Sequence, residues 1–423
     1  MWVRTRIQLA LVHVAVTMTA VPIQSALSRV MIKELALPAT LVAVLAAFPY
    51  ILSPLQIGIG SLSDRHPLGG RRRSPYILLG IILCGLGLAA APFAAYAYSE
   101  SRLAGLGLSI AAFGAWGIGF NFATVSYFSL AAELSGEKGR SRTIATMFFF
   151  MIVSIILTSI VLSRMLEPYS FAALARAFAR VAAVSVVVGL LGVVGLEGRY
   201  PGKPQRVARV SWGARLSGIA RNRHALLFFF YLVLMLAAIL GQDILLAPFA
   251  GTAFHMSVRE STGITSVWGT FTLATLVLAG ALGSRVNKRL VIAAGSLGAV
   301  AAYIGIIFSG LAASPGLFYA GVAVLGLATG LATVSNLSLM LDMTAAGRVG
   351  LFMGAWGMAD AIARLAGNVV GGVVRDVVTR FSGSSVLGYA TVFGVMAFML
   401  VLSLGLLPRI NVAIFQREAE KVV

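Results

Sequence analysis

The sequence predicts an all-α membrane protein with 12 transmembrane helices in two six-helix halves. Three observations predict this class. Hydrophobic residues make up 59% of the 423-residue chain and charged residues 11%, against about 45–50% and about 25% in soluble domains. Apolar stretches, each long enough to cross a hydrocarbon layer of roughly 30 Å, follow one another along nearly the whole length. The sequence lacks the short alternating segments of membrane strands, so helices rather than a barrel are expected.

The apolar stretches account for each predicted helix in order. We expect spans at residues 7–30, 38–62, 74–97, 104–131, 142–163, 174–197, 225–250, 261–283, 289–313, 316–341, 350–373 and 386–407. The first run, Ile7 to Val30, is too long for a signal peptide and has no convincing cleavage site, so it is predicted to be a helix. The single cysteine, Cys84, lies within a span, which excludes an internal disulfide and a cysteine-based metal cluster.

The basic residues indicate which ends of the spans face the cytoplasm. With the N-terminus inside, 23 of the 33 lysines and arginines fall on inner segments and nine on outer segments, while Arg364 lies within a span. Cytoplasmic loops carry an excess of these residues, so both termini are predicted to be cytoplasmic. The formal charge of +19 sits in short runs between spans. The expected partner of this charge is therefore the lipid bilayer and not nucleic acid.

A long basic connection divides the spans six and six. It predicts an N-terminal half at 1–198, a cytoplasmic linker at 199–224 and a C-terminal half at 225–423. Within the linker, Trp212, Leu216 and Ile219 share one helical face among several arginines. Two interpretations remain open: a basic amphipathic helix on the anionic inner leaflet, or a solvated basic linker.

The two halves repeat each other weakly. The stretch Gly60-Ser-Leu-Ser-Asp-Arg65 ends the second span, and Gly280-Ala-Leu-Gly-Ser-Arg285 ends the eighth. In a second echo, Glu133 is followed by Gly139-Arg140, as Asp342 is followed by Gly347-Arg348. Matched features at equivalent places indicate a parallel duplication of a six-helix unit.

A motif after the second span resembles the signature of the major facilitator superfamily. It consists of Gly60, Asp64, Arg65, Gly70, Arg71 and Arg72. Gly60 is expected to let helices approach closely, and Asp64 to meet a helix N-terminus or a neighbouring arginine. The chain departs from the usual pattern by inserting His66-Pro67-Leu68.

Three further stretches resemble the PucC-type family, also called the bacteriochlorophyll delivery family. They are Arg29-Val-Met-Ile-Lys-Glu-Leu35 with Pro38, Gly241-Gln-Asp-Ile-Leu-Leu-Ala-Pro-Phe249, and Leu341-Asp-Met-Thr344 with Gly354-x-Trp356-Gly357 and Arg375-Asp376. Ala247 stands where this family usually has a glutamate. The resemblance implies a bacterial photosynthetic membrane protein that helps assemble light-harvesting complexes. It also implies (bacterio)chlorophyll as a transient ligand, antenna polypeptides as partners, and pigment-synthesis enzymes as further candidate partners.

Ionisable groups inside spans are the best pointer to a site, because a lone charge at the bilayer centre costs about 3 kcal/mol or more. Trp356, Asp360, Arg364 and Asn368 are spaced by four and form a polar stripe. The order of Asp360 and Arg364 favours pairing within one helix. The stripe is interpreted either as part of a ligand cavity or as a self-neutralised pair that fixes helix packing. Asp360 stands where the family often has an amide.

Gln242 and Asp243 lie about two thirds of the way along the span 225–250, shortly before Pro248. A proline frees a backbone carbonyl and permits a break, as in the discontinuous helices of transporters. Asp243 is therefore a candidate for binding a proton or a ligand, and the alternative is a structural hydrogen bond.

Three other polar residues lie within spans. His13 is a candidate ligand for the magnesium of a chlorophyll, provided that its second ring nitrogen is hydrogen-bonded, and the alternative is a packed histidine. Asn121 and Asn336 lie near the middle of two spans. Interhelical hydrogen bonds explain both, and substrate contact is the other interpretation.

The sequence carries no phosphate-binding glycine loop, no His/Cys metal cluster and no catalytic triad. It therefore predicts neither an enzyme, nor a bound metal, nor a covalently bound cofactor. The favoured function is an assembly factor that binds or delivers (bacterio)chlorophyll to antenna polypeptides. The alternative is a secondary transporter of a small solute that works by alternating access.

Overall fold

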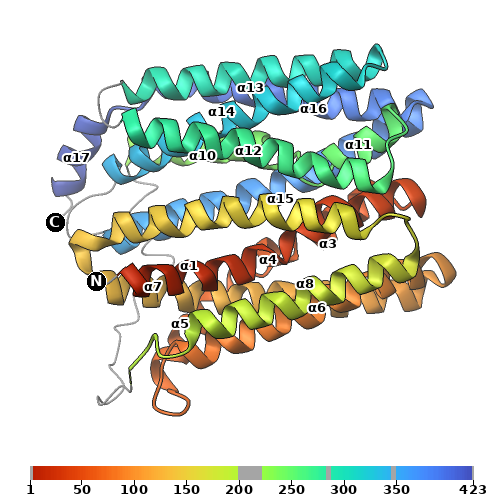
Figure 1. Cartoon of the computed structure of the whole chain (residues 1–423). Coiled ribbons are helices and arrows are strands. Elements are labelled where there is room, and N and C mark those ends of the chain that lie inside the picture. Colours follow the sequence, from red (N-terminus) through yellow and green to blue (C-terminus); the bar gives the residue numbers. More distant parts are fainter. Residues whose placement is uncertain (1–2, 199–221, 283–286, 344–348, 422–423) are drawn as a thin grey trace. The chain divides into compact units, whose positions relative to one another are not determined.

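Long helices make up nearly all of the described chain (Figure 1). The computed structural model describes residues 3–198, 222–282, 287–343 and 349–421. Within these ranges no β-strand is present, and the extended pairing is confined to a single bridge between Leu68 and Arg71. The predicted all-α class is confirmed. The predicted linker lies almost wholly outside the described residues, as do Arg285, Gly347 and Arg348 of the sequence repeat.

The chain packs into two compact units. Unit 1 comprises Met1–Arg206, Leu246–Gly251 and His255–Ser266, and unit 2 comprises Val207–Leu245, Thr252–Phe254 and Val267–Val423. These bounds describe packing. The division at 198 and 225, which concerns a duplication of the chain, stays a prediction.

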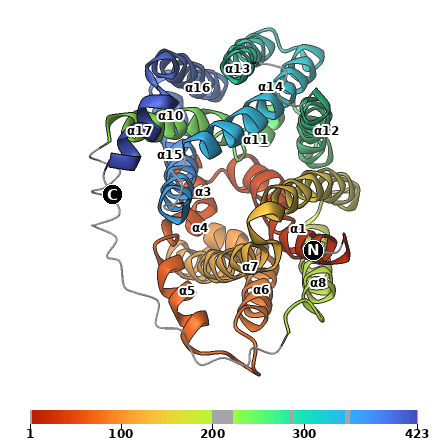
Figure 2. The ribbon, with the colours of Figure 1, turned by 90° about the vertical axis from the view of Figure 1, so that its left-hand side faces the viewer.

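Unit 1 is built from the first six predicted spans. Its helices are α1 (Val3–Thr17), α2 (Ala20–Pro22), the π-helical segments η1 (Ile23–Leu27) and η2 (Val30–Glu34), α3 (Ala39–Ala46), α4 (Phe48–Ile51), α5 (Leu55–Arg65), α6 (Ser74–Glu100), α7 (Arg102–Met165) and α8 (Phe171–Val193). Helices α1, α6, α7 and α8 pack side by side (Figure 2).

Helix α7 contains two predicted spans and folds back between them. The Ser135 hydroxyl donates a hydrogen bond of 2.8 Å to the Thr143 hydroxyl, although eight residues of straight helix would separate them by roughly 12 Å. Two apolar stretches, Arg102–Ser135 and Arg142–Met165, flank this turn. The prediction of two separate spans is therefore correct.

Small residues bring α6 and α7 into backbone contact. A Cβ added to Gly119 would lie 2.5 Å from the Gly80 carbonyl oxygen and 2.6 Å from the Cys84 amide nitrogen. Close approach of this kind replaces the hydrophobic effect as a source of helix association in lipid. One turn earlier, the Trp116 indole N–H donates to the Thr19 hydroxyl (3.0 Å) and so ties α7 to the first span.

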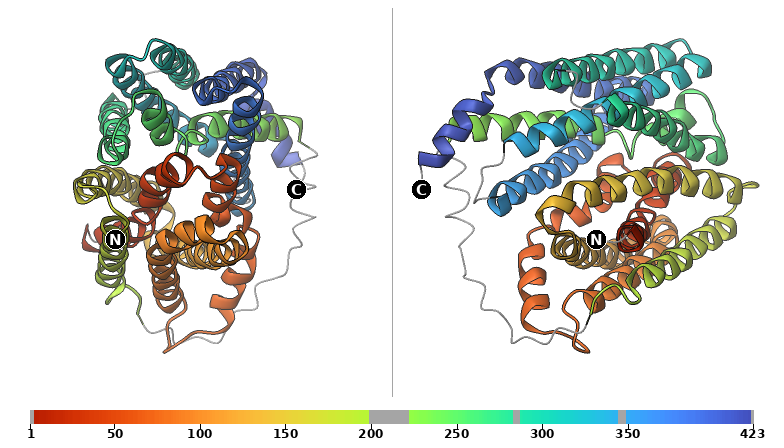
Figure 3. Two further views of the ribbon diagram at one scale, coloured as in Figure 1. Left: turned by 90° about the vertical axis from the view of Figure 1, so that its right-hand side faces the viewer. Right: turned by 60° about the vertical axis from the view of Figure 1, so that its left-hand side comes forward.

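Unit 2 contains most of the remaining helices. In chain order these are α10 (Arg223–Leu240), α11 (Leu246–Ala253), α12 (Val258–Leu282), α13 (Lys288–Leu311), α14 (Pro315–Asp342), α15 (Val349–Ser382), α16 (Ser385–Leu406), the 3-10 turn η4 (Leu407–Arg409) and α17 (Val412–Lys421). Most of α11 and the first turns of α12 belong to unit 1. Helix α13 packs against α14 and against α16, while α10, α15 and α16 pack against one another (Figure 3).

Several helices begin where the sequence supplies a side chain that accepts a backbone N–H. Ser170, Asn222, Asn287 and Ser384 each accept from an amide two or three residues further on. Each cap satisfies one of the amide groups that an α-helix leaves without an internal partner.

Ten helices of the described chain are long and apolar enough to cross a membrane. The two other predicted spans are also helical. The span 38–62 is interrupted between α3, α4 and α5, and α15 carries charged residues within its apolar sequence. Helical structure is thus present at all 12 predicted spans within the described residues.

Candidate functional site

The predicted break in the span 225–250 is present. Helix α10 ends at Leu240, residues 241–245 form turns, and α11 begins at Leu246 with Pro248 in its first turn. The Ala238 carbonyl, which precedes the break, accepts a hydrogen bond of 2.5 Å from the Tyr303 hydroxyl on α13. A side chain therefore replaces a backbone donor that the unwound segment no longer provides.

The first span is interrupted in a similar way. Helix α1 ends at Thr17, and after a turn at Met18 and Thr19 the chain continues as a short α-helical turn and π-helical segments. Both restarted segments end close to a residue with positive φ, Ala36 (50°) in one and His255 (54°) in the other. Interruptions at corresponding places in two repeats are typical of binding sites in transporter folds.

The polar stripe on α15 lies beside the break in unit 2. Arg364 Nε donates to Asp360 Oδ2 at 3.1 Å, which confirms the predicted pairing. Arg364 is also within electrostatic reach of Asp243. Trp356, one turn before Asp360, is fully buried against Phe228 of α10, with ring centroids 4.7 Å apart.

Backbone contact fixes where α15 meets the break. A Cβ added to Gly367 would lie 2.5 Å from the Ala237 carbonyl oxygen and 3.0 Å from Gly241 Cα. The next residue on each side of this contact is a buried amide, Gln242 at the break and Asn368 on α15. We call Gln242, Asp243, Asp360, Arg364 and Asn368 the helix-break site.

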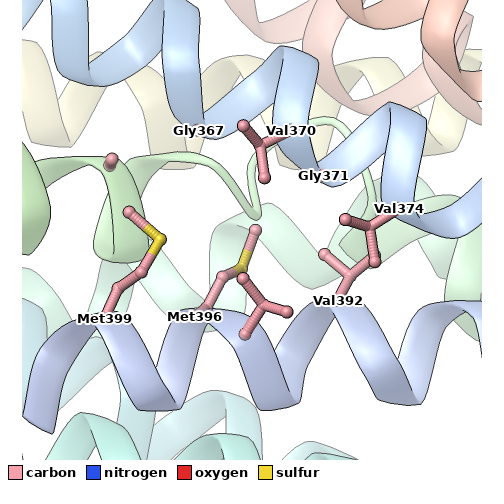
Figure 4. A pocket seen from close by; sticks show the side chains of 9 residues that line it. Gly367, Val370, Gly371, Val374, Val392, Met396 and Met399 are labelled. Atoms are coloured by element: carbon pink, nitrogen blue, oxygen red, sulfur yellow. The ribbon is translucent and has the colours of Figure 1, made fainter.

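An apolar cleft adjoins this crossing. Its lining comes from α10, α15 and α16 and includes Gly367, Gly371, Val392 and Met396 (Figure 4). The open space is about 10 Å³, roughly what one water molecule needs. The cleft is therefore too small for a pigment macrocycle in this conformation.

Gln242 Nε2 donates to Asp243 Oδ1 at 2.9 Å. This bond orients the amide and leaves Gln242 Oε1 buried without a donor among the described residues. Asn368 Oδ1 is also buried without a donor there. Such oxygens are rare in folded proteins, and each calls for an explanation.

Asn121 and Asn336 are satisfied by interhelical hydrogen bonds, as the packing interpretation predicted. Asn121 donates to the Pro49 carbonyl (2.9 Å) and accepts from Gln56 Nε2 (2.7 Å). Asn336 accepts from the Tyr231 hydroxyl (2.7 Å) and donates to the Ala332 carbonyl (2.7 Å). Because both amides are engaged, neither offers a free group to a ligand in this conformation.

His13 lies in the core of unit 1 and is 3% exposed. Tyr127, Phe128 and Phe148 surround the imidazole, with ring centroids 5.2–5.8 Å away. Neither ring nitrogen has a hydrogen-bond partner among the described residues. Ligation of a chlorophyll magnesium stays a prediction, and it requires these aromatic rings to move.

The facilitator-like motif forms a charge cluster around a residue that the sequence analysis did not single out. Arg73, 6% exposed, binds Asp64 (2.7 Å) and Glu133 (2.9 Å) and donates to the Ser63 hydroxyl. The other predicted members lie at the edge of this cluster. Arg65 and Arg71 are exposed, while Arg72 approaches Glu133 at 3.9 Å. Asp64 thus meets an arginine, one of its two predicted partners.

Glu197, which follows α8, binds the start of α6. Its carboxylate accepts from the amides of Arg72, Arg73 and Ser74 at 2.7–3.1 Å. An anion is favoured at a helix N-terminus. The only sequence feature that pointed to Glu197 was an acidic residue next to an apolar span.

The sequence interpretation of Gly60 was wrong. A Cβ at this position would meet Val125 Cγ1 at 3.5 Å, an ordinary contact, so close helix approach does not require the glycine. Gly69 and Gly70 are required instead, because both have positive φ (59° and 75°) in the tight turn between Leu68 and Arg71. This turn accommodates the inserted residues.

The second sequence repeat, Glu133 in one half and Asp342 in the other, forms an equivalent ion pair in each unit. Glu133 at one place pairs with Arg73 before α6, and Asp342 at the equivalent place pairs with Lys288 at the start of α13 (2.7 Å). The repeat therefore extends from sequence to interactions.

Sequence reasoning also missed Arg29 as a site residue. It is 3% exposed, pairs with Glu34 (2.8 Å) and donates to the Met256 carbonyl (3.1 Å), all within unit 1. Its position at the outer end of the predicted span 7–30, where it was counted as part of an outer segment, could have identified it, because arginines at membrane depth are functional candidates by default.

We expect Asp64→Ala to leave insertion intact and to loosen the loop between α5 and α6. Arg73 keeps Glu133 but loses one charged hydrogen bond, worth about 1.5–3 kcal/mol. Trypsin cleavage of the solubilised protein at Arg65 and Arg71 should accelerate about tenfold or more. Asp342→Ala, which removes the partner of Lys288 in unit 2, a side chain more exposed than Asp64, is the control and should leave this cleavage unchanged. Unaltered cleavage in Asp64→Ala would show that the ion pair of Asp64 does not hold this loop in place.

Comparison with known proteins identifies the family. Residues 26–415 match the family model described as PUCC protein. The chain belongs to the PUCC family. It is 30% identical to Protein PucC of Rhodobacter capsulatus, over 94% of this chain and 90% of that protein. It is 28% identical to the Bacteriochlorophyll synthase 44.5 kDa chain of the same species, over 94% and 92%.

Solved structures show the fold of this PUCC family member. A bacterial homologue of the human lysosomal transporter Spinster, inward-facing and unoccupied, superposes with a TM-score of 0.73 at 13% identity, over 98% of this chain and 97% of the other. The peptide transporter POT in complex with sulfate gives 0.71 at 16% identity, over 96% and 95%. The fold is therefore of the major facilitator type, in a multi-pass membrane protein.

Proposed function

We propose that this chain is an assembly factor for photosynthetic light-harvesting complexes. In this role it binds (bacterio)chlorophyll and delivers it to antenna polypeptides in the membrane. The observation that carries the proposal is the match to the PUCC family over residues 26–415. A relative of similar length whose name refers to bacteriochlorophyll supports a pigment as the ligand.

The proposal includes no catalysis, although that relative is named a synthase chain. Several polar groups that an enzyme could use are engaged in structural bonds in the described residues. Asn121 and Asn336 connect helices, Glu133 pairs with Arg73, and Arg364 pairs with Asp360. Pigment-synthesis enzymes are proposed instead as partners from which the chain receives its ligand, because the name of that relative refers to bacteriochlorophyll synthase.

The proposed location is the photosynthetic inner membrane of a bacterium, with both termini in the cytoplasm. The excess of basic residues on one set of connections, 23 against nine, supports this orientation.

A second candidate function is secondary transport of a small solute. The observation that favours it is the pair of interrupted spans, with an aspartate and two buried amide groups gathered at one of them. Converging polar groups at a helix break suit a small polar solute better than a macrocycle.

We expect a deletion strain to lose most of its assembled antenna complex while it continues to synthesise free pigment. A delivery factor acts after synthesis, so precursors should not accumulate. Absorption spectra of membranes and extracted pigments measure both quantities, and complementation with the wild-type gene is the control. A proportionate fall of total pigment with accumulated precursors would indicate synthesis. Normal antenna with defective uptake or export of a solute would favour the transporter.

A further inference from the structure

Between their ends, the described membrane-spanning segments of unit 2 carry one more carboxylate than cations. In α10, α13 and α14, charged residues stand only at the helix ends, and α16 contains none. The charges between those ends are Asp243, Asp360 and Arg364, together with the neighbouring pair of Arg375 and Asp376 (2.9 Å). The latter pair is neutral, so the helix-break site has a formal charge of −1 in its ionised form. An uncompensated charge in a membrane interior is costly.

Two further observations at the same crossing indicate what compensates this charge. Gln242 Oε1 and Asn368 Oδ1 are buried acceptors without donors among the described residues. Both amides are next in sequence to the glycines whose backbones touch, Gly241 and Gly367. The site thus combines one excess carboxylate with two unused neutral oxygens beside an unwound helix.

We propose that the helix-break site binds a sodium ion, with the Asp243 carboxylate, Gln242 Oε1 and Asn368 Oδ1 among its ligands. One monovalent cation balances the charge of −1, whereas a divalent ion would leave an excess of +1. Hard cations prefer oxygen ligands, and unwound backbone at a broken helix binds sodium ions in other transporter folds.

The competing explanation is a proton on Asp243. A protonated carboxyl group neutralises the site, but its single O–H satisfies at most one of the two amide oxygens. An organic cation is disfavoured because α10 and α15 are in backbone contact and the adjoining cleft holds only about 10 Å³. The sodium site goes beyond the proposed function and does not depend on pigment delivery. It also adds a metal-ion site that the sequence did not predict.

The test is binding of radioactive sodium to the purified full-length protein in nanodiscs, at a pH where free carboxyl groups are ionised. Saturable binding should be displaced by unlabelled sodium, and choline at equal ionic strength should not displace it. Sodium should also raise the melting temperature relative to choline, because a ligand of the folded state stabilises it. No saturable binding to the wild type, or a response to pH alone, would overturn the proposal.

Variants connect the binding to the named residues. Asp243→Asn should weaken sodium binding by about tenfold or more, the loss usual when the support of a metal site is removed. Asn368→Leu and Gln242→Leu keep the charge and should each weaken it as well, which guards against a folding defect in a single variant. Asp342→Asn changes a carboxylate paired with Lys288 outside the site and is the matched control. Equal affinity in Asp243→Asn, or an equal loss in Asp342→Asn, would contradict the assignment.

Discussion

We expect Arg364→Ala to lower the folded yield far more than the double variant Asp360→Ala/Arg364→Ala. The single change leaves Asp243 and Asp360 as two carboxylates without the guanidinium that now pairs with Asp360 at 3.1 Å. It makes the formal charge of the helix-break site more negative by one. The double change leaves that charge as it is in the wild type. Removing one partner of an ion pair is commonly worse than removing both.

The cost of a lone charge in the membrane, about 3 kcal/mol on insertion scales, sets the upper bound of this effect, because the Asp360 side chain is 44% exposed. Fluorescence-detected size-exclusion chromatography after heating would give folded fractions for the wild type and the variants. Arg380→Ala is the control, because Arg380 is an exposed arginine near the end of the same helix. Equal folded fractions in the single and double variants would show that the pair contributes nothing to folding.

The spans could be predicted because lipid imposes a simple requirement on sequence. Every backbone group must be satisfied inside a segment, so length and apolarity identify helices directly. The break near Asp243 was predictable for a related reason. Pro248 cannot donate a backbone N–H, and the polar Gln242 and Asp243 stand shortly before it.

Partners across the fold were harder to predict than positions along it. The sequence identified Asp64 as a residue that meets an arginine but gave no reason to choose Arg73 over Arg71 or Arg72. That choice depends on the turn at Gly69 and Gly70, which leaves Arg71 exposed and Arg73 buried at the start of α6. Glu197 is more than 120 residues away in the chain from Ser74, whose amide it binds. Local sequence patterns therefore carry no information about this contact.

Gly60 and Gly119 also show that the sequence does not reveal which residues meet across the fold. Gly60 stands in a recognisable motif, yet its Cβ position is open. Gly119 stands in no motif, yet its backbone touches α6. Which glycine is required depends on where two helices cross, and the crossing point depends on all the side chains along both helices.

The second large effect is expected for Gly119→Ala. The new methyl carbon would lie 2.5 Å from the Gly80 carbonyl oxygen and 2.6 Å from the Cys84 amide nitrogen, and neither backbone atom can rotate away. The helices must separate, which also loosens the contact between Trp116 and Thr19 one turn away. Overpacking a core costs about 1–3 kcal/mol and occasionally more, and we expect the upper end because the obstacle is backbone.

Gly107→Ala on the same helix is the matched control for this prediction. No atom lies within 4 Å of its Cβ position, so the change removes only the flexibility of glycine and should stabilise the helix by up to about 1 kcal/mol. Melting temperatures of the two purified variants should therefore move in opposite directions from the wild type. If Gly119→Ala has the same melting temperature as the wild type, α6 and α7 do not meet through their backbones. In that case the position of Trp116 against the first span does not depend on how closely these two helices pack.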